Sequence, residues 1–254
     1  KFILMFFFTF CFILTKFNFI QVTDSQIKTL LSFLKLNIFS PEIRDNPMFN
    51  GLNEYLRQIE LECGLAVGTL CKPELIEKTA TEIRLYGWKK IQAANISFIP
   101  SNDFSFYDNM LDTAFLLGAV PTRYASLSLS PLETYFAAAH GYQGPAGDVK
   151  ALPMKKWFNT NYHYIVPELS DNTTLALSKN NKVLAEYNEA SNNGISTVPT
   201  VIGVYTFLHF ATYTGKKTAT DFAKDAAAAY LDLAKSLAKA GAKWISFAEP
   251  ALVL

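Results

Sequence analysis

The sequence predicts an α/β fold, in which helices alternate with short strands along the chain after residue 24. Segments with apolar residues at helical spacing are separated by short runs rich in Val, Ile and Thr. Polar clusters follow directly after several of these runs. Strands that are separated by helices pair in parallel, and residues at their carboxyl ends gather at one face. We therefore expect a (β/α)8 TIM-barrel-like fold with a polar site at that face.

The expected helices are recognised by their ends. Asp24-Ser25 is a capping pair, Pro73 stands at a first-turn position, and Gly118, Gly141 and Gly241 each follow a helical pattern. The predicted helices cover residues 24–35, 52–61, 73–91, 107–117, 131–139, 182–192 and 218–239.

The expected strands are shorter and carry β-branched or aromatic residues. They cover residues 96–100, 157–166, 197–204 and 243–247. Residues 141–150 are rich in glycine and predict a loop. This loop lacks the GxxxxGK[ST] order, so it is not predicted to bind phosphate.

The composition excludes several classes of protein. Half of the residues are hydrophobic and 18% are charged, which is typical of a well-buried globular fold. The formal charge is +1 and there is no basic stripe, so we expect no nucleic-acid partner. The three cysteines form no CxxC and the three histidines form no HxxxH or HExxH pattern. We therefore expect no cofactor and no complete metal site within this chain.

Residues 1–45 are predicted to be an N-terminal extension, separate from a domain over residues 46–254. Residues 2–14 are apolar except for Thr9, with Lys1 before the run and Lys16 after it. Three interpretations stay open: an unrelated extension, a signal or membrane anchor, and a buried element. We expect a cytoplasmic protein with no membrane contact, or a secreted or tethered protein if residues 1–20 are a signal segment.

The densest polar cluster is the run from Trp157 to Glu168, which follows the pair Lys155-Lys156. Burying Asn159, Asn161 and His163 without partners would cost roughly 1–3 kcal/mol each, so we predict that they line a polar cleft. For His163, satisfaction by backbone groups in a polar loop stays open.

Three further candidates stand at the ends of predicted strands. Asn102 and Asp103 follow the strand predicted over residues 96–100, and Glu249 follows the one over residues 243–247. We expect all three to line the cleft. For Asp103, the role of N-cap of the next helix is favoured over a role in the site, because aspartate is a strong N-cap.

Two long stretches carry a resemblance to a known family. They are Ile99-Pro100-Ser101-Asn102-Asp103-Phe104-Ser105 and the run from Lys156 to Glu168. Shorter pieces with the same order include Leu116-Leu117-Gly118-Ala119-Val120-Pro121 and Glu249-Pro250-Ala251-Leu252-Val253. Over residues 47–254 the chain resembles the N-terminal half of cobalamin-independent methionine synthases.

The resemblance implies an incomplete N-terminal barrel of a two-barrel methyltransferase. Members of that family transfer a methyl group from 5-methyltetrahydrofolate with a glutamate tail to homocysteine, which forms methionine. The family's zinc site, which activates homocysteine, belongs to a C-terminal barrel, so this chain alone is expected to be inactive. The family's folate-tail contacts correspond to Lys156 and Arg57. The alternative is a non-catalytic, divergent paralogue or fragment that keeps the barrel fold and binds an anionic ligand.

Overall fold

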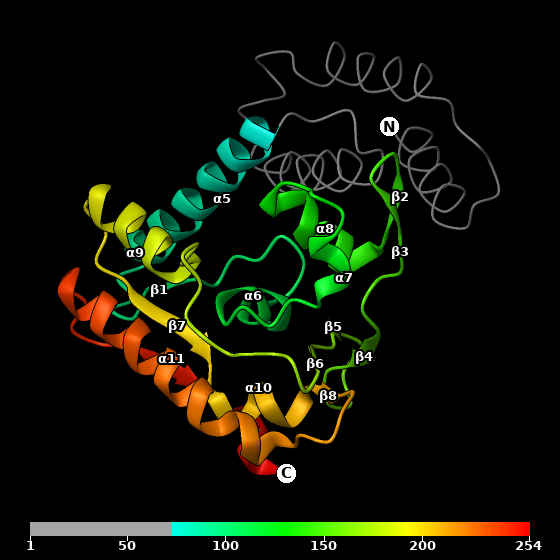
Figure 1. The fold of residues 1–254 in the computed structure, drawn as a ribbon. Helices are drawn as coiled ribbons and strands as arrows, with labels where there is room; N and C mark the ends of the chain where they lie inside the picture. The colour runs from blue at the N-terminus through cyan, green and yellow to red at the C-terminus, as the bar shows by residue number, and fades with distance from the viewer. Residues whose placement is uncertain (1–72) are drawn as a thin grey trace. The chain divides into compact units, whose positions relative to one another are not determined.

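The computed structural model describes residues 73–254, whose helices and strands are drawn in Figure 1. The helices are α5 (Pro73–Ala93), α6 (Asn109–Leu116), α7 (Thr122–Ala125), α8 (Pro131–His140), α9 (Lys182–Asn192), α10 (Val204–Phe210), α11 (Ala219–Lys239) and the 3-10 helix η1 (Pro250–Val253). The strands are β1 (Pro100–Ser101), β2 (Tyr142–Gly144), β3 (Gly147–Val149), β4 (Met154–Lys156), β5 (His163–Ile165), β6 (Glu168–Leu169), β7 (Val198–Ile202), β8 (Thr212–Tyr213) and β9 (Ser246–Ala248). The helices predicted over 24–35 and 52–61, the boundary at 45/46, the three cysteines and Arg57 lie outside the described residues.

A three-stranded parallel sheet organises this part of the chain. Its order is β1-β7-β9, with Pro100 paired to Val198 and Thr200 paired to Ser246. Helices α6 to α9 come between β1 and β7 in the chain, and α10 and α11 come between β7 and β9. A second parallel pair joins β6 to β8. The predicted α/β class is confirmed, whereas the strands of residues 73–254 do not close into a barrel.

All five helices that were predicted within the described residues agree with the structure to within two residues at each end, and several of these ends carry strong local signals. Helix α9 begins after Asn181, whose side chain accepts a hydrogen bond from the Leu184 N–H. Helix α8 has Pro131 in its first turn and a capping box between Ser130 and Glu133. Gly141 ends α8 with a φ of 83°, a conformation that favours glycine.

The strand predictions were less accurate. Of the strand predicted over 96–100, only Pro100 belongs to a strand, which is β1 (Pro100–Ser101). Ile96 and Phe98 are about half exposed, so these apolar residues do not mark a buried strand. Residues 141–150, predicted as a loop, contain the antiparallel hairpin β2–β3, whose strands of three residues each are too short to show an apolar alternation. Helix α10 had not been predicted. It begins at Val204, the last residue of the strand predicted over 197–204.

The core of this region lies between the sheet and the helices α6, α10 and α11. Helix α11 contributes a buried face at helical spacing, as the amphipathic pattern predicted. This face consists of Phe222, Ala226, Ala229, Tyr230, Leu233 and Leu237. The Tyr230 hydroxyl donates a hydrogen bond to the carbonyl of Ile202 at the end of β7, so the helix is also tied to the sheet by a polar contact.

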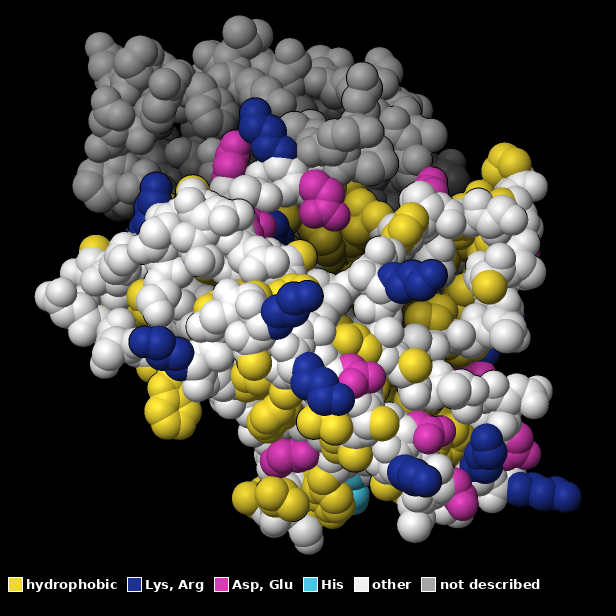
Figure 2. All heavy atoms as spheres, turned by 60° about the vertical axis from the view of Figure 1, so that its left-hand side comes forward, with side chains coloured by type: hydrophobic (Ala, Val, Ile, Leu, Met, Phe, Trp, Pro, Cys, Tyr) yellow, Lys and Arg dark blue, Asp and Glu magenta, His cyan; other side chains and the backbone are white. Residues whose placement is uncertain are grey.

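The surface of the described residues mixes both signs of charge. On the face shown in Figure 2, basic and acidic side chains lie interspersed among neutral ones. Between residues 73 and 254, no helix combines the length and the apolar character that crossing a membrane demands.

Candidate functional site

The antiparallel hairpin β4–β5 brings four of the predicted site residues together. Lys156 lies directly opposite His163, while Lys155 lies opposite Tyr164. Asn159 and Asn161 belong to the loop between the two strands. Lys156, Asn159, Asn161 and His163 are all exposed. Strand β5 is shorter than the strand predicted over residues 157–166, because residues 157–162 form the turn of the hairpin.

Backbone and ring contacts hold the loop of this hairpin. The Trp157 N–H donates to the Tyr162 carbonyl at 2.8 Å, and the Thr160 hydroxyl donates to the Trp157 carbonyl at 2.6 Å. The rings of Trp157 and Phe158 both pack on Phe210 of α10, with centroids 5.1 and 5.2 Å away. The segment that follows Lys156 is thus anchored to the helical layer.

Lys156 has a free ammonium group within the part of the chain that the structure describes, where it forms no ion pair or hydrogen bond. Next to it, Nδ1 of His163 lies 3.0 Å from the carbonyl oxygen of Asn161. A carbonyl only accepts, so Nδ1 carries the proton of this bond and Nε2 is left for another partner. The pair offers the ammonium of Lys156 to an anionic ligand, with the imidazole of His163 beside it.

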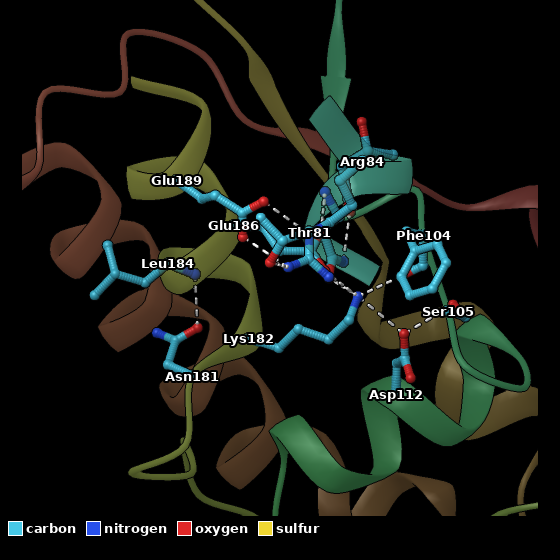
Figure 3. A network of polar contacts seen from close by, with 12 residues as sticks. Thr81, Arg84, Phe104, Ser105, Asp112, Asn181, Lys182, Leu184, Glu186 and Glu189 are labelled. Atoms are coloured by element: carbon cyan, nitrogen blue, oxygen red, sulfur yellow. Dashed lines mark hydrogen bonds and ion pairs between the residues drawn. The ribbon is translucent and has the colours of Figure 1, made fainter. Parts of the chain in front are cut away.

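Asn102 lies in a different place, where it is hydrogen-bonded to Lys182 and Glu186 in a partly buried polar network. Figure 3 shows Lys182 and Glu186 with the other labelled residues of this network. The Asn102 backbone adopts a φ of 63°, which asparagine tolerates better than most residues. Its Nδ2 donates to the carbonyl of Thr200 on β7 at 2.9 Å, and its Oδ1 accepts from Lys182 Nζ at 2.9 Å. The Asn102 N–H donates to Glu186 Oε2 at 3.0 Å. The residue therefore links β1, β7 and α9.

Lys182 is the principal cation of this network. Its Nζ lies 3.1 Å from Asp112 Oδ2, 3.0 Å from Glu186 Oε1 and 2.6 Å from the carbonyl oxygen of Phe104. Burial alone lowers the pKa of Lys182, but Asp112 and Glu186 outweigh it and raise that pKa above its usual value. Burial raises the pKa of Glu186, although Lys182 and Arg84 oppose the rise.

Arg84 of α5 extends the network along the same face of α9, from Glu186 to Glu189. Its guanidinium group donates to both carboxylate oxygens of Glu189, at 3.2 and 2.7 Å, and lies 3.9 Å from Glu186. Such a two-point pair fixes the orientation of two helices whose contacting residues are 105 positions apart in the chain.

The same charged groups form one wall of a pocket of about 670 Å³ between α5, α6, α8 and α9. Phe106, Phe115 and Tyr135 are among the aromatic residues that line it. None of the residues predicted from the sequence to line a cleft lies on its wall. Because Arg84 and Lys182 pair with carboxylates of α6 and α9, the wall holds helices together.

The remaining two candidates lie at strand ends, as the sequence predicted. Asp103 follows Asn102 and is exposed. Glu249 follows β9, and its two carboxylate oxygens accept hydrogen bonds from the N–H groups of Tyr205 (3.0 Å) and Thr206 (2.7 Å). These N–H groups belong to the first turn of α10, so Glu249 satisfies donors that the helix leaves without partners.

Sequence reasoning missed Asp108 and Lys182. Asp108 is the N-cap of α6, and its Oδ1 accepts from the Leu111 N–H at 2.8 Å. The preference for aspartate at N-caps would have pointed to it, because a helix was predicted from residue 107. The i,i+4 spacing of Lys182 and Glu186 on a predicted helix was the available signal for the network.

No group of three or more His, Cys, Asp or Glu side chains in residues 73–254 is arranged to hold a metal ion.

Comparison with known proteins identifies the family. The sequence matches the family described as "Cobalamin-independent synthase, N-terminal domain" over residues 68–254. It is 48% identical to a 5-methyltetrahydropteroyltriglutamate–homocysteine methyltransferase of Lactococcus lactis over 181 residues, which are 71% of this chain and 24% of that protein. The proteins of that name from Campylobacter jejuni and Bifidobacterium longum are 48% and 50% identical over 182 and 184 residues. These stretches are 72% and 70% of this chain, and 24% of each relative.

The chain thus spans about a quarter of the length of the curated relatives that it matches. The matched stretch contains all the described elements, including the hairpin of Lys156 and the network of Lys182. A family match over more than half of the residues shows that this chain belongs to the cobalamin-independent synthases, as part of their N-terminal domain.

Proposed function

We propose that this chain is the folate-binding, N-terminal part of a methyltransferase that moves a methyl group from 5-methyltetrahydrofolate to homocysteine and forms methionine. The names of the relatives, which specify a pteroyltriglutamate and homocysteine, support this assignment. Identities of 48% to 50% do not favour the alternative of a divergent, non-catalytic paralogue. A C-terminal barrel that carries the zinc site is the expected partner of this domain.

We also propose that the described strands are part of a (β/α) barrel. The sheet β1-β7-β9 supports this, because its neighbours follow in chain order, run parallel and are separated by helices. In such a barrel the residues after β1, β7 and β9 share the face that carries the active site. Asn102, Gly203 and Glu249 stand at these positions.

The observation that carries the proposal is the exposed ammonium of Lys156 on an anchored hairpin. The tail of a pteroyltriglutamate carries several carboxylates, which bind best to fixed cations through charge-assisted hydrogen bonds. Lys156 donates such bonds to one tail carboxylate, and His163 and the amides of Asn159 and Asn161 border the same position. The role of these residues is to bind and orient the folate. Arg57, the other candidate for the tail, lies outside the described residues.

Titration calorimetry of the chain with 5-methyltetrahydrofolate triglutamate and monoglutamate tests the proposal. We expect Lys156→Ala to weaken triglutamate binding by about 1–3 kcal/mol and to affect the monoglutamate less. Added salt should reduce the loss. Lys155→Ala is the matched control, because its side chain projects from the opposite face of β4. Equal losses for both lysines, or no loss for either, would remove Lys156 from the site.

A further inference from the structure

One buried carboxylate joins the Lys156 hairpin to the helical layer. Asp108 is 1% exposed, and its two oxygens serve two different elements. Its Oδ1 accepts from the Leu111 N–H of α6 at 2.8 Å, and its Oδ2 accepts from the Ile165 N–H of β5 at 2.9 Å. The second bond spans 57 positions of sequence and ends two residues from His163.

The hydrogen-bond pattern of the hairpin explains why Ile165 is available to Asp108. Bonds from Trp157 N to Tyr162 O and from Val166 N to Pro153 O mark hydrogen-bonded pairs. These pairs alternate along an antiparallel ladder, so Lys155–Tyr164 is also hydrogen-bonded, while Lys156–His163 and Met154–Ile165 are not. The Ile165 N–H therefore points away from β4, toward the Asp108 carboxylate, which accepts its hydrogen bond.

The same alternation places the Lys156 side chain. Residues that are paired without ladder bonds have closely spaced side chains on one face, so Lys156 and His163 share the face of Ile165. The backbone of β5 at Ile165 is buried and held by Asp108, and β4 is paired to it along its whole length. The base from which the exposed lysine extends is thus fixed through β5.

We propose that Asp108 is a positioning residue for the folate tail: by holding β5 against α6, it sets where the Lys156 ammonium meets the tail carboxylate. The inference rests on the proposed function of Lys156. Lysine is a flexible point charge with a long stem, so its contribution to a site depends on how well its backbone is held. Helix capping alone would be a structural role, and the two roles separate because they use different oxygens of Asp108.

The variant Asp108→Ser tests the positioning role. Serine is a good N-cap and keeps the bond to Leu111, but its shorter side chain does not span to Ile165. The matched control is Asn181→Ser, which makes the same kind of cap replacement at α9, away from the hairpin. Asp108→Asn is the second variant; it keeps the length but gives only one acceptor oxygen for two N–H groups. Each variant is titrated with the triglutamate and the monoglutamate of 5-methyltetrahydrofolate.

We expect Asp108→Ser to lower triglutamate affinity about fivefold, which is part of the roughly tenfold to hundredfold that a charge-assisted hydrogen bond supplies. Monoglutamate affinity should stay nearly unchanged, as should both affinities of Asn181→Ser. In the background of Lys156→Ala, Asp108→Ser should add no further loss for the triglutamate, because Asp108 acts through the lysine.

Equal losses for the two ligands, or an undiminished loss in the Lys156→Ala background, would overturn the positioning role. A triglutamate preference that depends on Lys156 but not on Asp108 would overturn this inference and leave the proposed function standing. A preference that does not depend on Lys156 would overturn both.

Discussion

Lys156 and Lys182 show two opposite uses of the same side chain in one domain. The ammonium of Lys182 lies within 3.1 Å of four oxygen atoms, from Asn102, Phe104, Asp112 and Glu186. That of Lys156 is exposed and forms no such contact within the described residues. A lysine whose donors are all satisfied by the protein holds the fold together, whereas a lysine with unsatisfied donors on a fixed strand is available to a ligand. The difference supports a structural role for Lys182 and is consistent with the binding role proposed for Lys156.

The largest expected effect is the loss of the Lys182 ammonium. Within the described residues, Lys182→Ala leaves Asp112 without a paired cation and leaves Glu186 with only Arg84, 3.9 Å away; the side chains of Asp112 and Glu186 are only 8% and 4% exposed. Removing one partner of a buried ion pair strands the other charge, so we expect a loss of about 3 kcal/mol in the free energy of unfolding. Urea denaturation measures it. Lys179→Ala, an exposed lysine three residues earlier, is the control and should change little. A loss below about 1 kcal/mol for Lys182→Ala would mean that the network is not structural.

Some of these features could be predicted from the sequence, and others could not. Helices α9 and α11 were predicted well, because Asn181 and Thr218 mark their starts and their buried faces repeat at helical spacing. The Lys156 hairpin was singled out by its unusual density of polar and aromatic residues. The contact between Arg84 and Glu189 spans 105 positions, and no local pattern reports a pair at that separation. The parallel strands β1 and β6 have only two residues each, too few for a period of two to be visible.

A second prediction concerns Asp108, which connects α6 to strand β5 of the Lys156 hairpin. Desolvation by burial raises the pKa of Asp108 to about 6, although the N–H groups of Ile165 and Leu111 lower it, and neighbouring Asp112 adds to the rise. The folded state then binds a proton more tightly than the unfolded state between the usual value of 3.8 and about 6. Stability therefore falls as pH rises through this window, by about 3 kcal/mol at most for this group.

Urea unfolding at several pH values between 4 and 7 checks the prediction. Glu186, whose pKa burial also raises, contributes a slope of the same sign, so the comparison is between the wild-type chain and Asp108→Asn. We expect the variant to show a flatter dependence on pH. Parallel curves for the two proteins would show that Asp108 titrates alike in the folded and unfolded states.

A third, smaller effect distinguishes capping from ligand binding at Glu249. Its carboxylate accepts from two N–H groups in the first turn of α10, and a negative charge is favourable at that end of a helix. We expect Glu249→Ala to cost about 1–2 kcal/mol of stability, and Glu249→Gln about half of that. Folate affinity of the folded variants should not change. A loss of affinity without a loss of stability would return Glu249 to the binding site.

The smallest expected effect is the change in stability of Lys156→Ala. It tests the comparison of Lys156 with Lys182 directly, because a lysine without a partner in the protein should contribute little to stability. Lys156 lies opposite His163 and not opposite a carboxylate, so the substitution removes no attractive pair within the described residues. Exposed positions without such features usually change stability by less than about 0.5 kcal/mol, and we expect the same here. Urea denaturation of Lys156→Ala and Lys155→Ala side by side measures the difference. A loss above about 1 kcal/mol for Lys156→Ala alone would reveal a partner within the protein. Lys156 would then resemble Lys182, and its effect on the folate tail would have to be attributed to structure.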